Sequence, residues 1–198
     1  MITTLIDSPV ANVANIARAL RHVGAELEVT NDAATIVRAE QLVLPGVGSF
    51  VAAMEWLRVS NVGDAIVDAV ARGASLLGIC VGHQLLFDWS YEHGTTRGLG
   101  LVRGEVRQFT TTLPVPQIGW NRVAFDGSPL FSSIDSGTPF YFVNSYAATN
   151  APAEIARADY GGPFTAALQS GRVFGVQFHP EKSSTAGLQV LRNFIAWK

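Results

Sequence analysis

Hydrophobic and polar residues follow different patterns in the two halves of the chain. In the first half, short apolar runs typical of buried strands are followed by segments in which apolar residues recur every three or four positions, as on one face of a helix. In the second half, short apolar runs are separated by Gly, Pro, Ser and Asp, which is typical of strands joined by turns. We therefore expect alternating strands and helices, followed by a series of strands.

The first half predicts parallel strands joined by helices, because strands that alternate with helices pair in parallel and carry helices on both faces of the sheet. In the first predicted helix, Asn12 is a candidate N-cap and Gly24 is a stop signal. The apolar face of this helix is formed by Val13, Ile16, Ala17, Leu20 and Val23. The predicted strands span residues 2–6, 25–30, 41–46 and 74–79, and the predicted helices span residues 13–23, 50–57, 62–72 and 81–88.

The second half predicts further strands and one closing helix. The strands span residues 98–109, 117–125, 139–149, 164–170 and 172–178. The helix spans residues 186–197, with Leu188, Leu191, Phe194 and Ile195 on its buried face. No linker or internal repeat divides the chain, so residues 1–198 are expected to form a single domain. The expected fold class is α/β, with a central, mainly parallel sheet flanked by helices and an antiparallel extension.

Composition and charge exclude several classes of protein. Hydrophobic residues make up 48% and charged residues 15% of the 198 positions, which is typical of a globular chain. The net charge is −2 and there is no basic cluster, which argues against nucleic acid and anionic membranes as partners. The start of the chain does not resemble a signal peptide, and no apolar run reaches the roughly 18 residues of a membrane span. We expect a cytoplasmic protein.

The single cysteine of the chain, Cys80, lies in a segment typical of a nucleophile. One cysteine allows neither an internal disulfide nor a cysteine-based zinc site, and we expect no metal. Gly78-x-Cys80-x-Gly82 stands between a predicted strand and a predicted helix, as in a nucleophile elbow with sulfur in place of oxygen. The following helix N-terminus would favour the thiolate. A lone cysteine is more often buried and inert, but the two glycines favour the nucleophile.

His179 and Glu181 are candidates for a base and the group that orients it. At the end of an extended strand, residues two apart project to the same side, and Pro180 restricts the backbone between them. A carboxylate that holds one imidazole nitrogen leaves the other free to face a nucleophile. A surface histidine beside a solvated glutamate is the simpler alternative for this short motif alone.

The loop Leu44–Phe50 is a candidate oxyanion site. Glycines directly after a strand let backbone N–H groups approach a substrate closely, and Val47, Gly48 and the amide of Val81 are the expected donors. Loss of one such donor typically costs about 3–4 kcal/mol of transition-state stabilisation. A phosphate-binding or dinucleotide-binding loop is the alternative, but Gly46-x-Gly48 lacks the third glycine and the Lys-Ser/Thr of those motifs.

The three motifs PGVGSF, GICVGHQLL and QFHPEKS, in this order and spacing, resemble those of the class I glutamine amidotransferases. The resemblance covers nearly the whole chain and implies the fold of that family and no cofactor. It also implies that a cysteine thiolate attacks the side-chain amide of glutamine, giving a thioester and ammonia, with Cys80 as nucleophile, His179 as proton shuttle and Glu181 as its orienter. The implied glutamine-binding residues are Gly46, Val47, Gly48, Val81, Gln84, Ser145 and Tyr146.

Other segments are most similar to one branch of this family, the glutaminase subunits of imidazole glycerol phosphate synthases in histidine biosynthesis. These segments are GLGLVRGEV, GWN, YFVNSY and GLQVLRNF. The resemblance implies a heterodimer with a cyclase subunit that is built as a (β/α)₈ barrel and receives ammonia through a shielded channel. The positions implied for the docking face are Asn12, Asn15, Trp120, Asn121 and Lys182.

The chain departs from this branch outside the three catalytic positions. Gln117 and Asn144 stand where histidine is usual, and His83 is more like other class I members. The segment 7–15 lacks the aromatic-glycine opening common in this branch. The departures leave open a glutaminase that feeds another synthase, for example one forming amino sugars of surface polysaccharide. Two further alternatives are a catalytically silent scaffold for a barrel partner and a cysteine peptidase of similar fold.

Overall fold

A central eight-stranded sheet runs through the protein in a computed structural model that describes residues 1–9 and 11–197. The strand order is β2-β1-β3-β4-β14-β13-β12-β9. The first five strands of this order are parallel: β2 (Glu26–Thr30), β1 (Ile2–Ile6), β3 (Gln41–Gly46), β4 (Ser75–Cys80) and β14 (Val173–Val176). Strand β14 lies beside β4, so the carboxyl ends of β3, β4 and β14 meet at one edge.

The remaining strands form the antiparallel extension, except that β5 and β7 pair in parallel. The sheet continues through β13 (Pro163–Ser170), β12 (Glu154–Asp159) and β9 (Ala124–Phe125). Two small sheets lie beside it. One pairs β10 (Pro139–Asn144) with β8 (Gln117–Arg122), and the other has the order β11 (Tyr146–Ala148), β7 (Val102–Gln108), β5 (Phe87–Ser90), β6 (Thr96–Arg97). The expected class, an α/β fold with a mainly parallel sheet and an antiparallel extension, is confirmed.

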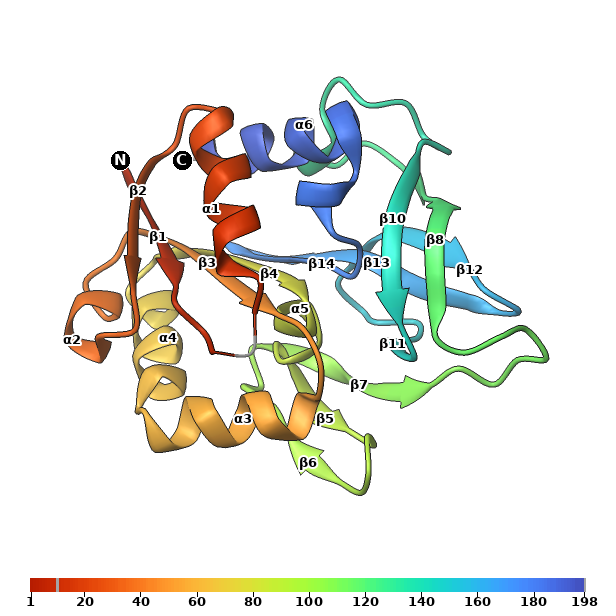
Figure 1. The fold of residues 1–198 in the computed structure, drawn as a ribbon, viewed down its shortest axis with the longest axis horizontal. Coiled ribbons are helices and arrows are strands. Elements are labelled where there is room, and N and C mark those ends of the chain that lie inside the picture. Colours follow the sequence, from red (N-terminus) through yellow and green to blue (C-terminus); the bar gives the residue numbers. More distant parts are fainter. Residues whose placement is uncertain (10, 198) are drawn as a thin grey trace.

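Helices cover both faces of the large sheet, as Figure 1 shows. The helices α1 (Val13–His22) and α6 (Ser184–Ile195) lie on one side, and α3 (Phe50–Val59) and α4 (Val62–Ala71) lie on the other. Short helical segments are α2 (Ala33–Ile36), α5 (Val81–Gln84) and the 3₁₀ turns η1 (Pro129–Phe131) and η2 (Pro180–Lys182). Within the described ranges, no helix is long and apolar enough to cross a membrane.

Helix α1 forms where the pattern predicts it. The side chain of Asn12 caps the helix by accepting a hydrogen bond from the amide of Asn15 at 3.3 Å. The apolar side chains at Ile16, Ala17 and Leu20 are buried against the sheet, as their spacing predicts. The cap and the apolar face together fix the start of α1, which carries Asn12 and Asn15, two of the positions implied for the docking face.

Stacked phenylalanines join the antiparallel extension to the small sheet of β8 and β10. Phe140 and Phe178 stack with ring centroids 4.2 Å apart, and Phe142 packs edge-on against Phe164 at 5.5 Å. All four rings are almost completely buried. Phe178 directly precedes His179, so this aromatic cluster anchors the backbone on which the candidate base stands.

The structure differs from the predicted elements at several points. The strands predicted over 117–125 and 139–149 are each divided, into β8 and β9 and into β10 and β11. The helix predicted over 81–88 ends at Gln84, and Phe87 begins strand β5 because it pairs with Val102 of β7. The strand β12 and the short elements α2 and β6 were not predicted. In α6, Leu191 and Phe194 are buried as predicted, whereas Leu188 and Ile195 are half-buried and Gly187 and Val190 complete the buried face.

Candidate active site

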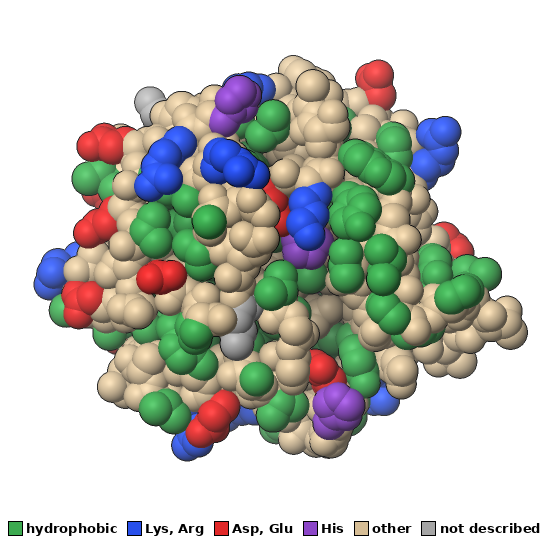
Figure 2. All heavy atoms as spheres, in the orientation of Figure 1, with side chains coloured by type: hydrophobic (Ala, Val, Ile, Leu, Met, Phe, Trp, Pro, Cys, Tyr) green, Lys and Arg blue, Asp and Glu red, His purple; other side chains and the backbone are tan. Residues whose placement is uncertain are grey.

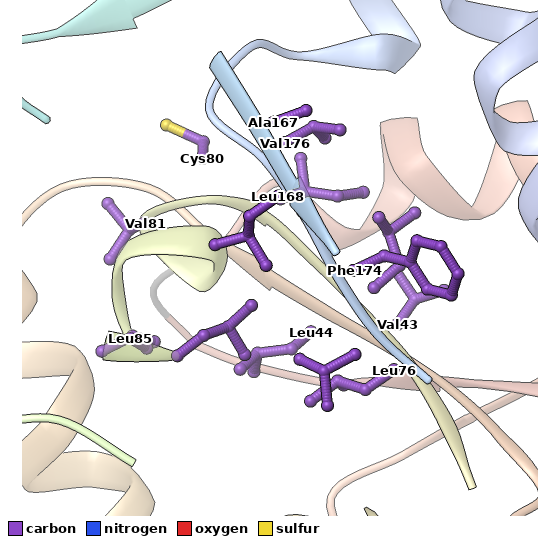
Figure 3. Close-up of a cluster of buried hydrophobic side chains, with 14 of the residues drawn as sticks. Val43, Leu44, Leu76, Cys80, Val81, Leu85, Ala167, Leu168, Phe174 and Val176 are labelled. Atoms are coloured by element: carbon purple, nitrogen blue, oxygen red, sulfur yellow. The ribbon is translucent and has the colours of Figure 1, made fainter. Parts of the chain in front are cut away.

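Cys80 ends β4 in a strained turn that presents its sulfur at the edge of the sheet. Its φ is +56°, a value that side chains other than glycine rarely adopt, and Gly46 is its register partner on β3. A Cβ at Gly46 would lie 2.8 Å from the amide nitrogen of Gly82, so the two segments meet this closely only as glycines. Figure 3 shows the sulfur pointing away from the hydrophobic cluster that fills the space behind the turn.

The helix predicted to follow Cys80 is present but short. The helix α5 after Cys80 has four residues, so its dipole is too short to stabilise a thiolate strongly. Two polar groups approach the sulfur directly instead: the backbone oxygen of Val143 lies at 3.8 Å and Nε2 of Gln177 at 3.9 Å. The sulfur thus has one acceptor, one amide donor and the imidazole of His179 beside it.

His179 and Glu181 are hydrogen-bonded, with 2.9 Å between Nδ1 and Oε1. The pairing was predicted, but the predicted cause was wrong. Strand β14 ends at Val176, and Glu181 lies in the 3₁₀ turn η2, which folds its side chain back onto the ring. The backbone amide of His179 donates to the oxygen of Tyr141 at 2.9 Å. The hydroxyl of Ser183 donates to the oxygen of His179 at 2.7 Å, so both ends of the residue are fixed.

The electrostatics of this pair favour a charged ring. Burial of His179 disfavours protonation, but interactions with Cys80 and Glu181 outweigh it and raise the pKa of His179 to about 10. The side chains of His179 and Glu181 are 4% and 1% exposed. Water therefore screens this interaction little, and the imidazolium is the form expected at neutral pH.

A pocket of about 460 Å³ opens at this edge of the sheet, within the roughly 300–1,000 Å³ typical of small-molecule sites. Cys80 and His179 line it, and Glu181 lies behind the ring. Of the implied glutamine-binding positions, Gly46 does not reach the pocket, because it packs against the turn after Cys80. The others line it: Val47, Gly48, Val81, Gln84, Ser145 and Tyr146.

Sequence reasoning missed two polar residues at this site. Glu92 lines the pocket, is 8% exposed, and accepts a hydrogen bond from the amide of Phe50 at 2.7 Å. It stands in a segment without a motif, so no sequence signal could have found it. Gln177 is completely buried beside the sulfur. Its only signal was its place in QFHPE, two positions before the candidate base.

The implied docking-face residues are distributed around and beyond the mouth of the pocket. Asn12 and Lys182 are exposed and line it, and Trp120 is 54% exposed on β8. Figure 2 shows hydrophobic side chains gathered on this face over β8 and β10. The other two positions make local contacts: Asn15 accepts a hydrogen bond from Arg18 at 2.7 Å, and Asn121 donates to the backbone oxygen of Asp159 at 2.8 Å.

The three positions that depart from the family branch are all buried. Gln117 and Asn144 are register partners on β8 and β10, so the two departures are neighbours. Asn144 donates to the backbone oxygen of Tyr146 at 3.0 Å and lines the pocket. His83 lies behind Cys80, and burial lowers its pKa to about 3, so the ring is neutral. None of the three contacts His179 or Glu181 through a hydrogen bond within the described chain.

A metal centre finds no support in the described residues. They contain no group of three or more His, Cys, Asp or Glu side chains arranged to hold an ion. The polar groups around Cys80 are amides and one imidazole–carboxylate pair. The chemistry that these groups offer is nucleophilic attack by sulfur with proton transfer by the histidine.

Comparison with known proteins shows the family of the chain. The family model described as glutamine amidotransferase class-I matches residues 4–197. The imidazole glycerol phosphate synthase subunit HisH of Moorella thermoacetica is 44% identical over 96% of this chain and 92% of that protein. The subunit of the same name from Caulobacter vibrioides is 41% identical over 98% and 97%.

Solved structures agree with the fold. A crystal structure of a glutamine amidotransferase aligns with a TM-score of 0.78 at 18% identity, over 98% of this chain and 97% of that chain. The structure of PurLQS from Thermotoga maritima aligns with a TM-score of 0.71 at 20% identity, over 98% and 96%. The match of a single family model to almost every residue decides the assignment: the chain belongs to the class I glutamine amidotransferase family.

Proposed function

We propose that this chain is the glutaminase subunit of an imidazole glycerol phosphate synthase. It hydrolyses glutamine to glutamate and ammonia and passes the ammonia to a cyclase subunit in histidine biosynthesis. The observation that carries the proposal is the placement of Cys80 beside a pocket that also holds His179, whose ring bonds Glu181 at 2.9 Å. Identity of 41–44% to proteins named as this subunit supports the choice of pathway.

The pocket offers groups for both ends of glutamine. Glu92 is the only carboxylate among the described residues that line the pocket, and it is placed to bind the α-ammonium group of the substrate. Gln84 uses its Nε2 for hydrogen bonds within the protein, which leaves its carbonyl oxygen for substrate N–H groups. Ser145 and Tyr146 line the pocket beside them. A site with these groups selects an amino acid with a side-chain amide.

Acylation follows from the protonation state of the pair. The thiolate of Cys80 attacks the amide carbon, and the developing oxyanion is stabilised by backbone amides of the Val47–Gly48 loop and of Val81. The imidazolium of His179 donates its proton to the leaving nitrogen. The carbon–nitrogen bond breaks, ammonia leaves, and a γ-glutamyl thioester and a neutral imidazole remain.

Deacylation reverses the proton transfer. The neutral imidazole of His179 accepts a proton from water as the water attacks the thioester. The carbon–sulfur bond then breaks, glutamate leaves, and the thiolate and imidazolium are restored. Glu181 keeps the ring in one orientation through both steps and stabilises the charged form, the role of the carboxylate in a catalytic triad.

A cyclase partner is part of the proposal. Ammonia released into neutral water becomes ammonium and loses its nucleophilicity, so a shielded route to the acceptor is needed. The exposed apolar face of β8, with Ile118 64% and Trp120 54% exposed, lies next to the pocket and suits a protein partner. Lys182 and Asn12 at the mouth of the pocket add polar contacts to this docking face.

We also propose that residues 1–198 act as one domain in the cytoplasm. Strands from both halves of the chain share the large sheet, which supports a single folding unit. A cytoplasmic site fits because the free thiol of Cys80 must remain reduced, as it does in that compartment.

The test of this proposal compares two nitrogen sources in the complex. The chain is purified with the cyclase partner and assayed with the phosphoribulosyl formimino intermediate, supplied with either glutamine or ammonium salts. We expect Cys80→Ser to lower glutamine-dependent product formation by about 10³-fold or more, because the nucleophile is lost. Ammonium-dependent formation stays at the level of the unchanged complex.

Two outcomes would contradict the proposal. Normal use of glutamine by the Cys80→Ser variant would remove the sulfur from the mechanism. A glutaminase that is active but forms no product with this cyclase and its intermediate would show that it feeds another synthase.

A further inference from the structure

Gln177 is a buried polar residue for which the proposed mechanism above has no role. It follows β14 directly, is completely buried, and takes part in two side-chain hydrogen bonds. Its Oε1 accepts a hydrogen bond from Nε2 of Gln84 at 2.9 Å, and its Nε2 lies 3.9 Å from the sulfur of Cys80. A buried amide with both ends in use is held in one orientation.

The orientation of this amide follows from a chain of donors and acceptors. The side chain of Gln84 lies 2.9 Å from the backbone oxygen of Tyr146, which only accepts hydrogen bonds, so the atom of Gln84 at this position is Nε2. That nitrogen also faces Gln177 at 2.9 Å, so the atom of Gln177 there is its oxygen. The remaining amide atom of Gln177, which faces the sulfur, is therefore its NH₂ group.

An NH₂ group beside sulfur favours the thiolate over the thiol. A hydrogen bond to a charged acceptor is roughly twice as strong as one between neutral groups, so the thiolate gains more from Gln177 than the thiol does. The backbone oxygen of Val143, 3.8 Å from the same sulfur, has the opposite effect because it accepts a hydrogen bond from the thiol. Since α5 is only four residues long, its dipole contributes less than the side chains that face the sulfur directly. These are Gln177 and the imidazole of His179, whose interaction with Cys80 raises the pKa of the ring, so the amide acts in addition to the imidazolium.

We propose that Gln177 is a catalytic residue whose NH₂ group stabilises the Cys80 thiolate and whose carbonyl oxygen fixes the amide of Gln84. The two contacts couple the nucleophile to substrate binding, because the same side chain sets the direction in which Gln84 presents its oxygen to the pocket. The stabilisation of the thiolate by Gln177 does not depend on which reaction the protein catalyses. The orientation of Gln84 by Gln177 rests on the proposed glutaminase function.

The pH dependence of alkylation by iodoacetamide tests the first role in the intact chain. Cys80 is the only cysteine, so the rate reports on this sulfur alone. We expect Gln177→Met, which keeps the length of the side chain but removes both polar groups, to raise the midpoint of the alkylation profile by about one pH unit, a tenfold shift of the thiol–thiolate equilibrium. An unchanged midpoint in a folded variant would overturn the proposal.

Gln41 provides a matched control. It is also a completely buried glutamine on a strand of the large sheet, with hydrogen bonds to Thr3 at 2.7 Å and to the backbone oxygen of Phe194 at 3.1 Å. It lies at the first residue of β3, at the opposite end from the pocket. Gln41→Met is expected to lower stability without moving the alkylation midpoint, and an equal shift in both variants would assign the effect to destabilisation.

A measurement on the unchanged protein covers the case in which Gln177→Met does not fold. The side-chain NH₂ resonances of Gln177 are followed by NMR while the thiol is titrated and again after alkylation. They are expected to move with the ionisation of the sulfur, whereas those of Gln41 stay constant. Resonances of Gln177 that do not respond to the sulfur would overturn the proposal.

Steady-state kinetics of the complex test the second role. Gln177→Met is expected to lower kcat for glutamine about tenfold and also to raise KM, because Gln84 is no longer held, while the ammonium-dependent activity is unchanged. A KM equal to that of the unchanged complex would remove the coupling to Gln84. If the unchanged complex itself hydrolyses no glutamine, the proposed function fails, and the alkylation profile still decides the role of Gln177.

Discussion

His83 is a polar residue in an apolar part of the core. Its side chain is completely buried behind Cys80, and neither ring nitrogen has a hydrogen-bond partner among the described residues. The edge of its ring packs against Phe87, with centroids 5.3 Å apart, so the contacts of the ring are those of an apolar group. A buried polar group without a partner costs about 1–3 kcal/mol of stability.

Replacing His83 by methionine is therefore expected to stabilise the protein. Methionine is flexible enough to fill the same space and carries no strong polar group. We expect His83→Met to increase the free energy of unfolding at pH 7 by about 1–3 kcal/mol in a urea titration. A decrease would show that the ring makes a favourable contact that apolar packing cannot replace.

The pH dependence of stability gives a second signature of His83. Its pKa is lowered from 6.5 to about 3 in the folded protein because burial disfavours the charged ring. The unfolded chain therefore binds this proton first, and folding is destabilised as pH falls from about 6.5 toward 3. Between pH 7 and pH 5 the unchanged protein should lose about 2 kcal/mol more than His83→Met, measured from urea midpoints at both pH values.

For single residues, the sequence predicted those site residues that lie inside a motif and did not predict those outside one. Cys80, His179 and Glu181 were predicted because glycines, a proline and a fixed spacing accompany them. Glu92 was not, because it reaches the pocket through a tertiary contact with the amide of Phe50 and not through a local pattern. When a residue joins a site only through tertiary contacts, the spacing of residues along the sequence does not indicate its role.

The turn between β4 and α5 is the element on which the nucleophile depends. A Cβ at Gly82 would overlap the backbone oxygen of Leu44 on β3, and a Cβ at Gly78 would lie 2.5 Å from the oxygen of Gly82. Both clashing oxygens belong to the backbone, one in β3 and one in α5, so neither clash is relieved by rotation of a side chain. The turn and the neighbouring strand must separate to admit even one methyl group.

We expect Gly82→Ala to lower stability by about 3 kcal/mol, at the upper end of what overpacking typically costs. The same change should reduce the glutaminase activity of the folded fraction, because the sulfur moves relative to His179. Thermal unfolding and glutamine turnover are the measurements. Gly162→Ala is the control, since a Cβ there meets no atom within 4 Å. Equal stability of the two variants would contradict the tight-turn account.

Elements were predictable where burial alone decides the pattern. The parallel strands β3 and β4 are completely buried and appear as continuous apolar runs. The segment after Cys80 is also apolar, and a short apolar run does not distinguish a helix from a strand. From Phe87 onward the segment forms strand β5 and not a helix, because it pairs with β7. Strand β12 escaped prediction because four of its six residues are charged or half-exposed.

The exposed apolar face over β8 and β10 is the feature of the whole molecule that calls for a partner. Trp120 is 54% exposed there, with its ring edge-on to Tyr141 at 6.0 Å. Exposed tryptophans at the centre of an interface often contribute about 2 kcal/mol or more to binding. The proposed docking face therefore has a natural anchor.

Trp120→Ala is expected to weaken binding to the cyclase partner by about 30-fold, which corresponds to about 2 kcal/mol. Stability of the isolated chain should change little, because half of the ring is already in water. Titration calorimetry with the cyclase measures the affinity. Trp89→Ala is the control, since Trp89 is 43% exposed on β5, in a different sheet. Equal losses in both variants would place the cyclase elsewhere.

The position of β14 between β4 and β13 has a consequence for how the protein folds during synthesis. A nascent chain emerging from the ribosome presents Cys80 long before the segment that carries its proton partner. Until that last strand enters the sheet, the sulfur has neither His179 nor Gln177 beside it. The sulfur therefore becomes reactive only after residues 173–181 have been made and have joined the sheet, which protects the growing polypeptide from premature chemistry at its own thiol.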